Sequence, residues 1–359
     1  MRPRQPLDRL TALLSPSVRA FVKSRLSPRL LGIARSDYAR RVAEEHARFA
    51  VETHIHDLPP IFHYWSNRFL RPMIESFGFS NPDEFYALHI AQRCSARETV
   101  SCLSIGAGNC DTEIRIAEAL LARGCANFRM TCVDLVPDML ERGRAAAAAA
   151  GVAEYFRFEA VDINVWDGGG ERYDIIIANQ CLHHFVELER LFDRIPVLAG
   201  ADGTFITSDM IGRNGHQRWP EARAQVDAFW EELPRKYRYN QQLRRQENRF
   251  RDWDCSVEGF EGIRSQDILP LLCQRFGFEF FVGYGNLVDP FIDRSFGWNF
   301  DASKEWDRAF IDRVHAADEE GLEQGRLTPT HMLAIMTMNP QQVTRTWRGR
   351  TPQASIRVP

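Results

Sequence analysis

The chain has 359 residues, of which 44% are hydrophobic and 26% are charged. This composition excludes disorder of the whole chain, and the length fits one large domain with insertions or two smaller domains. The formal net charge of −3 provides no overall cationic field for phosphate backbones, so a general nucleic-acid-binding protein is not expected.

The first 48 residues form a basic N-terminal arm, predicted to be helical or mobile. Within it, residues 1–35 carry eight lysines and arginines against one acid, which leaves a formal charge of −10 for the rest of the chain. Such a segment is compatible with peripheral contact with an anionic membrane surface or with a transit peptide, but four prolines interrupt any long helix. Residues 49–97 are predicted to be a helical lid.

Seven near-continuous apolar runs alternate with helical stretches in the rest of the chain. Strands buried on both faces have this pattern. We therefore expect an α/β fold, a Rossmann-like doubly wound sheet of seven mostly parallel strands with helices on both faces. The core is expected over 98–210 and 263–339. The predicted strands are Val100–Ile105, Phe128–Val133, Tyr155–Val161, Tyr173–Ala178, Gly203–Ser208, Phe278–Gly283 and Met332–Met338.

Two long stretches, 211–262 and 284–329, exceed what a minimal doubly wound unit requires. Both are rich in aromatic and charged residues, which predicts helical covers packed on the sheet rather than free loops. A cover of this kind shapes a pocket, and the first of the two is expected to cover an acceptor molecule. Residues 340–359 are predicted to be a flexible tail.

A glycine-rich turn, Gly106-Ala107-Gly108-Asn109-Cys110-Asp111, follows the first predicted strand and precedes a helix. Glycines let the backbone approach a ligand, and the helix N-terminus offers free N–H groups. By itself this turn fits a dinucleotide, a nucleotide or a structural role. Asp111 stands where the dinucleotide fingerprint has its third glycine.

Two carboxylates end the next two predicted strands. Asp134 is suited to accept hydrogen bonds from both hydroxyls of a ribose, and Asp162 to accept one from the exocyclic amine of an adenine. Each alone could be a helix cap or a solvated turn. Their joint placement at strand ends favours a nucleoside-containing ligand.

With these motifs the chain resembles the class I S-adenosylmethionine-dependent methyltransferases, over about 98–210, 264–283 and 331–339. The matching segments are Leu-Ser-Ile-Gly-Ala-Gly from Leu103, Val-Asp-Leu from Val133, Val-Asp-Ile from Val161, Tyr-Asp-Ile-Ile-Ile-Ala from Tyr173, Leu-His-His from Leu182 and Gly-Thr-Phe-Ile from Gly203. The resemblance implies S-adenosyl-L-methionine as cofactor and S-adenosyl-L-homocysteine as product. It implies that Gly106, Ala107, Gly108 and Asn109 face the methionine part, Asp134 and Leu135 the ribose, Asp162 and Ile163 the adenine, and Asn179 and Gln180 the methyl donor.

The sequence departs from the commonest family pattern at Cys110, where a third glycine often occurs, and at Ser104, where an acid is common. Asp111 or Glu113 is a candidate for the cofactor's amino group, although both also suit the first turn of a helix. Tyr64, within the predicted lid, is a further candidate contact with the cofactor. An aromatic residue at helical spacing also suits a core position.

Three residues near the tips of the fourth and fifth strands are candidates for removing a proton: His183, His184 and Asp209. The two histidines could instead cap the following helix. Arg213, His216, Arg218 and Tyr237 are candidates for binding the acceptor, while the arginines could equally pair with Glu221, Glu231 and Glu232.

Metal binding and secretion are not expected. The eight cysteines have no C-x-x-C pair or zinc-ligand spacing, and His54 and His56 with Asp57 lack a third histidine. No window offers the roughly 18 uninterrupted apolar residues of a membrane span. We expect reduced thiols in a cytoplasmic protein, with its oligomeric state left open.

The fourth strand continues Asn-Gln-Cys-Leu from Asn179, which lacks the Asn/Asp-Pro-Pro-aromatic sequence of methyltransferases that act on nucleobase amines. No Pro-Cys pair is there for covalent attack on a pyrimidine. We therefore expect a small-molecule acceptor, most simply an oxygen of a sugar-containing or secondary metabolite. N-methylation of a small amine, a non-catalytic cofactor-binding protein and a nicotinamide-dependent dehydrogenase are the alternatives.

Overall fold

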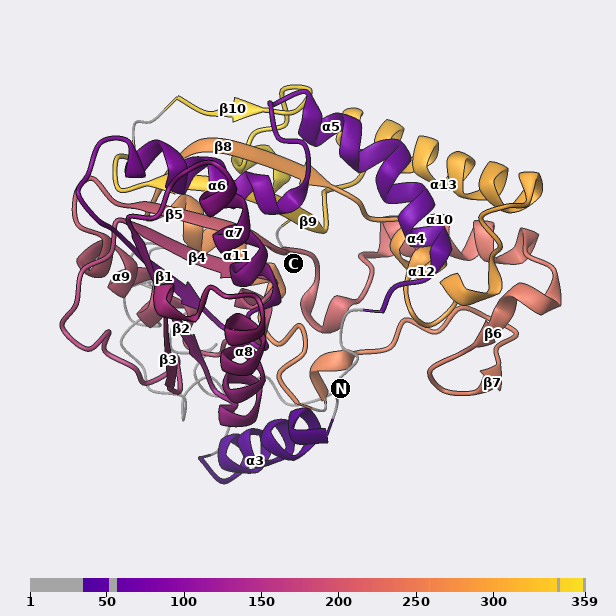
Figure 1. Ribbon diagram of the computed structural model, residues 1–359. Helices are drawn as coiled ribbons and strands as arrows, with labels where there is room; N and C mark the ends of the chain where they lie inside the picture. The colour runs from indigo at the N-terminus through magenta and orange to yellow at the C-terminus, as the bar shows by residue number, and fades with distance from the viewer. Residues whose placement is uncertain (1–34, 52–56, 258, 341–342, 358–359) are drawn as a thin grey trace, which may run out of the picture.

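The computed structural model describes residues 35–51, 57–257, 259–340 and 343–357. An α/β core and a mainly helical cover lie side by side (Figure 1). Within the described part of the chain, no helix combines the length and the apolar character that a membrane crossing needs. His54, His56 and the N-terminal arm up to residue 34 lie outside these ranges.

All seven predicted strands are present, and an eighth joins them in one sheet of order β10-β8-β9-β5-β4-β1-β2-β3. Strand β9 runs antiparallel to both β5 and β8, while the other pairs are parallel. The predicted Rossmann-like α/β class is confirmed, with eight strands instead of seven. The strands are β1 Val100–Ile105, β2 Phe128–Asp134, β3 Phe156–Ala160, β4 Ile175–Asn179, β5 Thr204–Met210, β8 Gly277–Tyr284, β9 His331–Thr337 and β10 Arg345–Thr346.

Helices cover both faces of the sheet. On one face α6 (Pro82–Cys94), α7 (Asp111–Ala122) and α8 (Pro137–Ala149) bury residues such as Phe85 and Leu120 against β1 and β2. On the other, α9 (Leu188–Ala199) and α11 (Ser265–Cys273) bury Phe192 and Leu272. Near-continuous apolar strands are stable only between two such layers, which explains why these strands can be recognised in the sequence.

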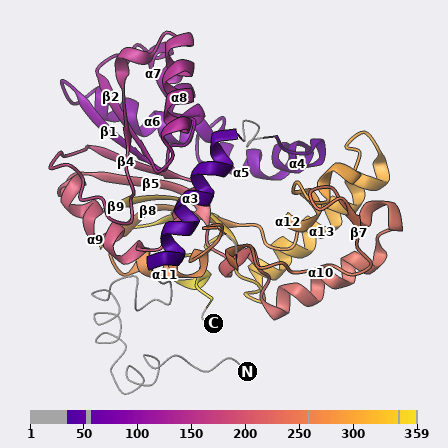
Figure 2. The same ribbon diagram turned by 90° about the horizontal axis from the view of Figure 1, so that it is seen from below.

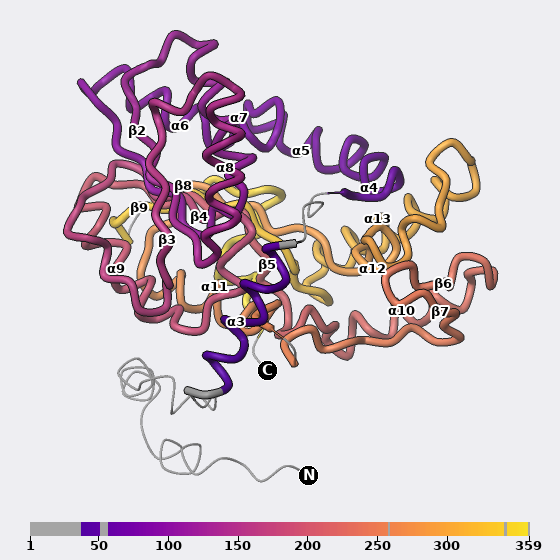
Figure 3. The backbone as a smooth tube through the Cα atoms, turned by 60° about the horizontal axis from the view of Figure 1, so that its bottom comes forward, coloured from indigo at the N-terminus to yellow at the C-terminus, as the bar shows by residue number. Residues whose placement is uncertain are grey.

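The cover has a core of its own, in which Trp230, Phe291 and Phe310 are at most 2% exposed. It is not wholly helical, because the first insertion also contains a small hairpin that lies at its outer end (Figures 1 and 3). The cover elements are α4 Pro60–Trp65, η2 Ser66–Leu70, α5 Arg71–Glu75, η5 Asn214–His216, α10 Pro220–Glu232, η6 Arg235–Arg238, β6 Tyr239–Asn240, β7 Arg245–Gln246, η7 Cys255–Val257, α12 Asp289–Ile292, η8 Gly297–Asn299 and α13 Glu305–Glu323. Shorter turns in the core and near the C-terminus are η3 Ala153–Tyr155, η4 Leu182–His184 and η9 Gln353–Ser355.

Helix α3 (Arg35–Val51) joins the core to the first insertion. Its Tyr38 donates to Asp162 at the end of β3, and its Arg41 donates to the carbonyl of Gly259. Figure 2 shows α3 in front of the sheet when the molecule is seen from below. The helix that reaches the strand ends therefore begins inside the predicted arm, whereas α4 of the predicted lid packs against α13.

The stretch predicted as a flexible tail is placed against the body over 343–357. Strand β10 pairs with β8, and Arg350, 9% exposed, donates to Glu319 of α13. Arg348 also pairs with Glu319. Two arginines of this stretch are thus paired with an acid of α13.

Candidate active site

The glycine-rich turn after β1 has the backbone that its sequence predicts. Gly106, Gly108 and Cys110 have φ of 64°, 55° and 60°, in the left-handed region that favours glycine. A Cβ atom on Gly106 would lie 2.6 Å from Cβ of Cys181. The turn and the segment after β4 are therefore in direct contact, and only a residue without a side chain fits between them.

Gly106→Ala is expected to lower the free energy of unfolding by at least about 2 kcal/mol, because it combines a strained φ with a clash. Gly169→Ala is the matched control, since Gly169 has φ of 62° and nothing lies within 4 Å of the position that its Cβ atom would take. Urea unfolding of the two variants measures the difference. Equal losses would contradict a tight contact at Gly106.

Both carboxylate oxygens of Asp134, at the end of β2, are bound by backbone N–H groups. Its two carboxylate oxygens accept N–H donors 2.9 Å away, from Gly108 to Oδ2 and from Val136 to Oδ1. Each oxygen keeps one further lone pair for a hydroxyl. Burial raises the pKa of Asp134, and the backbone donors oppose that rise. Leu135 lies beside it, partly exposed.

The residues around the turn support its shape. Asn109 accepts a hydrogen bond from Arg142 at 3.0 Å, and Asp111 begins α7. Buried Glu113 accepts a 2.6 Å hydrogen bond from Ser104, the position at which the family commonly has an acid. A carboxylate from the next helix is thus present where the strand itself supplies only a hydroxyl.

Asp162 at the end of β3 is engaged by α3. The Tyr38 hydroxyl lies 2.9 and 2.8 Å from its two carboxylate oxygens, and Asn164 donates through its backbone N–H. Neighbouring Ile163 is buried. Burial raises the pKa of Glu45 on the same helix to about 7, and the carboxylates of Glu261 and Asp134 act in the same direction. Helix α3 therefore lies over the strand-end carboxylates.

Because Tyr38 occupies the oxygens that an adenine amine would use, Tyr38→Phe is expected to tighten S-adenosylhomocysteine binding about fivefold, the value of one hydrogen bond. Tyr64→Phe is the matched control. Its hydroxyl donates to Asp312 on α13, so this variant should bind as the wild type does. Isothermal titration calorimetry compares them. Weaker binding by the Tyr38 variant would mean that the hydroxyl supports the cofactor site.

Asn179 and Gln180 lie at the tip of β4. Asn179 accepts from Tyr86 at 2.9 Å and donates to Thr112 at 3.2 Å, so it bridges α6 and α7. Gln180 has φ of 52° and donates to the Ser208 hydroxyl at 3.0 Å. The Gln180 side chain is exposed, whereas the strand behind it is buried. The chain turns sharply here and directs a polar side chain outward.

His183 and Asp209 form a buried pair that joins the ends of β4 and β5. Nδ1 of His183 lies 2.7 Å from Oδ1 of Asp209, and because a carboxylate only accepts, Nδ1 carries the proton. Oδ2 of Asp209 accepts from the backbone N–H groups of Cys181 and Leu182. Asp209 therefore fixes both the imidazole and the turn that contacts Gly106.

Glu261 extends this pair into a larger group, which we call the histidine–carboxylate cluster: His183, His184, Asp209, His216 and Glu261. Its Oε1 lies 2.6 Å from Nε2 of His216 and 3.4 Å from Nε2 of His183. Its Oε2 lies 3.6 Å from Nε2 of His184. Three segments distant in sequence thus supply one compact group of imidazoles and carboxylates.

The cluster shifts the pKa values of the two neighbouring histidines, His183 and His184, in opposite directions. Burial alone would lower the pKa of His183, but Asp209 and Glu261 outweigh it and raise the pKa to about 10. Burial and the proximity of His183 lower the pKa of His184 to about 4. Burial would raise the pKa of Glu261, yet the three histidines hold it far below its usual range.

Arg218 and Arg213, two of the residues predicted to bind the acceptor molecule, follow the cluster segment of β5. Arg218 is 9% exposed and donates to the carbonyl of His216 at 2.7 Å, while its Nε is buried without a partner. Arg218 also lies 3.4 Å from Asp289, which contacts His331 at 3.3 Å. Arg213 is turned to Trp219 and donates to the carbonyl of Arg218, so it supports the loop.

The structure places two predicted site tyrosines elsewhere. Tyr237 donates to Asp307 at 2.5 Å and stacks on Trp306 in the cover, and Tyr64 contacts Asp312. Both hydroxyls are satisfied within the cover, because a buried aromatic needs a partner for its polar tip. Sequence reasoning missed Glu261, Tyr38 and His331, which have no distinguishing motif around them.

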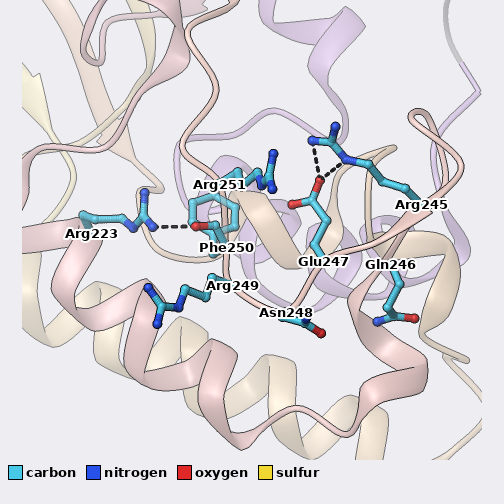
Figure 4. A pocket seen from close by; sticks show the side chains of 8 residues that line it. All are labelled: Arg223, Arg245, Gln246, Glu247, Asn248, Arg249, Phe250 and Arg251. Carbon is cyan, nitrogen blue, oxygen red and sulfur yellow. Dashed lines mark hydrogen bonds and ion pairs between the residues drawn. The ribbon is translucent and has the colours of Figure 1, made fainter.

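A separate pocket of about 500 Å³ lies in the first insertion, next to the hairpin (Figure 4). Figure 4 shows Arg223 bonded to the Phe250 carbonyl and Arg245 paired with Glu247. None of the predicted site residues lines it. The lining residues are Arg223, Arg245, Gln246, Glu247, Asn248, Arg249, Phe250 and Arg251.

Comparison with known protein families identifies the kind of domain to which the glycine turn and the two strand-end acids belong. Residues 103–205, which include the glycine turn, both strand-end acids and the His183 segment, match a family model described as a methyltransferase domain. Residues 103–205 form a methyltransferase domain, and the chain is similar here to the class I S-adenosylmethionine-dependent methyltransferases. S-adenosylmethionine is the cofactor of this family, and S-adenosylhomocysteine is its product.

Relatives of this methyltransferase are distant. It is 23% identical to the sterol 4-C-methyltransferase of Caenorhabditis elegans over 150 residues, which are 42% of this chain and 43% of that protein. The chain thus matches less than half the length of this curated relative. Similar solved structures include geranyl diphosphate C-methyltransferase from Streptomyces coelicolor, at 12% identity, 83% and 98% coverage of the two chains and a TM-score of 0.43. A putative sarcosine dimethylglycine methyltransferase from Galdieria sulphuraria has 13% identity, 72% and 85% coverage and a TM-score of 0.42.

Proposed function

We propose that this methyltransferase transfers the methyl group of S-adenosylmethionine to an oxygen of a small or medium polar acceptor, such as a sugar-containing or secondary metabolite. The observation that carries the proposal is the histidine–carboxylate cluster, whose buried members His183 and Asp209 are linked through Cys181 to the turn at Gly106. A hydroxyl needs to lose its proton during methylation, and such a cluster is suited to receive one.

The turn from Gly106 to Asn109 would hold the methionine part of the cofactor, and Asp134 its ribose. Once bound, the cofactor supplies a methyl group already activated on sulfonium sulfur. The acceptor oxygen forms the new O–C bond as the C–S bond breaks, and the electron pair of that bond stays on sulfur in the thioether product. The chain's main task is to align the acceptor oxygen with this bond.

His184 is the residue that we assign to accepting the proton. Its Nδ1 is buried and has no hydrogen-bond partner, so a hydrogen bond from the hydroxyl of a bound acceptor would satisfy this nitrogen. Both nitrogens of His183 face carboxylates, which makes it a positioning residue. Asp209 in turn holds His183, the arrangement that orients an imidazole in many active sites.

Polar groups beyond the cluster would bind the rest of the acceptor. Gln180, Arg218 and His331 come from separate elements around the same strand ends. The unpartnered Nε of buried Arg218 is a donor for which an acceptor oxygen would compensate. This set of polar groups suits a molecule with several oxygens.

N-methylation of an amine is the main alternative, because a neutral amine needs no dedicated base. A non-catalytic cofactor-binding protein and a dehydrogenase are less favoured, since neither makes use of the cluster.

The test is incubation with methyl-labelled S-adenosylmethionine and paired hydroxyl and amine analogues of phenols, sugars and hydroxy acids. Labelled ether products support the proposal. Labelled amines alone would overturn the choice of oxygen, and cofactor binding without any transfer would favour the non-catalytic alternative.

A further inference from the structure

Three members of the histidine–carboxylate cluster direct ligand atoms at one another. One ligand atom from each of His183, His216 and Glu261 lies within 4.8 Å of the other two. Nε2 of His183 and Nε2 of His216 lie 3.4 and 2.6 Å from Oε1 of Glu261. They come from η4, η5 and the loop before α11, so the fold alone brings them together. Two ligands of one zinc ion are separated by roughly 3–4 Å, given bonds near 2.1 Å, so small side-chain shifts complete such a site.

The side chains behind these ligands have the orientation that a metal site needs. Asp209 accepts a hydrogen bond from Nδ1 of His183 at 2.7 Å, which leaves Nε2 as the nitrogen that can bind a metal ion in exchange for its proton. Metal-binding histidines commonly have a carboxylate in this second position, because it fixes the tautomer and the ring. Arg218 donates to the carbonyl of His216 and so holds the loop that carries the second imidazole.

We propose that His183, His216 and Glu261 bind a divalent transition-metal ion such as zinc or iron(II). Two imidazoles and one carboxylate are the ligand set of catalytic zinc and of non-haem iron(II), whereas magnesium and calcium prefer oxygen ligands. Three protein ligands leave a coordination position open. Partly exposed His184, adjacent in sequence, has Nε2 3.6 Å from the other carboxylate oxygen of Glu261.

The role of the ion rests on the proposed function, but its binding does not. In that role the open position would hold the acceptor oxygen, and the positive charge would stabilise the oxygen as its proton passes to His184. The sequence does not predict this site, because its three ligands come from separate segments and so form no zinc-ligand motif. The proposed ligands do not include His54 or His56.

The full chain, purified without a metal-affinity column and dialysed against chelator, is titrated with Co²⁺. Its visible absorption bands report coordination by the protein, and calorimetry with Zn²⁺ gives the affinity. One equivalent is expected to bind. Glu261→Gln and His216→Gln should each weaken binding at least about a hundredfold, since removing a ligand costs no less than removing an outer partner. His63→Gln, at an exposed histidine on α4, should bind as the wild type does.

Circular dichroism and thermal unfolding of each variant establish that it is folded. Absence of stoichiometric Co²⁺ binding by the wild type would overturn the metal site, as would unchanged affinity in folded Glu261→Gln. S-adenosylhomocysteine binding is measured on the same samples. Cofactor binding without metal binding would overturn the metal site and leave the proposed methyl transfer intact. Metal binding without cofactor binding would overturn the proposed methyl transfer and leave the metal site intact.

Discussion

Asp134→Asn is expected to weaken S-adenosylhomocysteine binding about a hundredfold or more. The carboxylate already accepts from Gly108 and Val136, and its remaining lone pairs are available to a ribose. An asparagine amide has one acceptor oxygen and no charge, so at least one ribose hydroxyl loses its partner. A hydrogen bond to a charged group is worth about 1.5–3 kcal/mol, and two of them are affected. Calorimetric titration measures the loss.

The control for this variant is Asp138→Asn, an exposed acid in the first turn of α8. It removes the same charge close to the same strand end but leaves the carboxylate of Asp134 in place. Its affinity should remain near that of the wild type. If both variants lose affinity equally, the effect is one of overall charge, and Asp134 does not bind the ribose.

His184→Gln is expected to lower kcat by about a hundredfold to ten-thousandfold on a hydroxyl acceptor, the usual contribution of general base catalysis. The affinity for S-adenosylhomocysteine should stay within about twofold, because His184 does not belong to the turn or the strand-end acids. Rates are measured with the best ether-forming acceptor from the labelled panel. The split between kcat and cofactor affinity separates loss of a proton acceptor from loss of fold.

Exposed His63→Gln serves as control for this experiment and should keep the wild-type rate. A His184 variant that keeps its rate on a hydroxyl would require another proton acceptor. An amine acceptor that is methylated equally well by wild type and variant would favour N-methylation. Both comparisons use folded protein, which thermal unfolding establishes.

The sheet was predictable because its strands are buried on both faces. Val100–Ile105 agrees at both ends with β1, and the other predicted strands differ from the observed ones by at most two residues at either end. Strand β10 was missed because its two residues, Arg345 and Thr346, carry no apolar pattern. It is held by pairing with β8 and by the contacts of Arg348 and Arg350 with α13, which depend on the tertiary fold.

The site was only partly predictable, for a related reason. The glycine turn, Asp134 and the His183 segment follow strands directly, so their positions follow from the order of the strands. Glu261 lies within a long insertion between glycines, and Tyr38 is 124 residues from its partner Asp162. Tyr64 and Tyr237 have the residue type of ligand contacts, yet their hydroxyls are satisfied in the cover. Residue type alone does not distinguish a site from a core.

The assignment of S-adenosylmethionine as cofactor is tested most directly by measuring which ligands the wild-type protein binds. Calorimetric titration with S-adenosylmethionine, S-adenosylhomocysteine and NADH, repeated with Asp134→Ala, separates the cofactor classes. We expect micromolar binding of both sulfur ligands, no binding of NADH and loss of binding in the variant. Binding of NADH in place of the sulfur ligands would contradict the assignment and indicate a dehydrogenase.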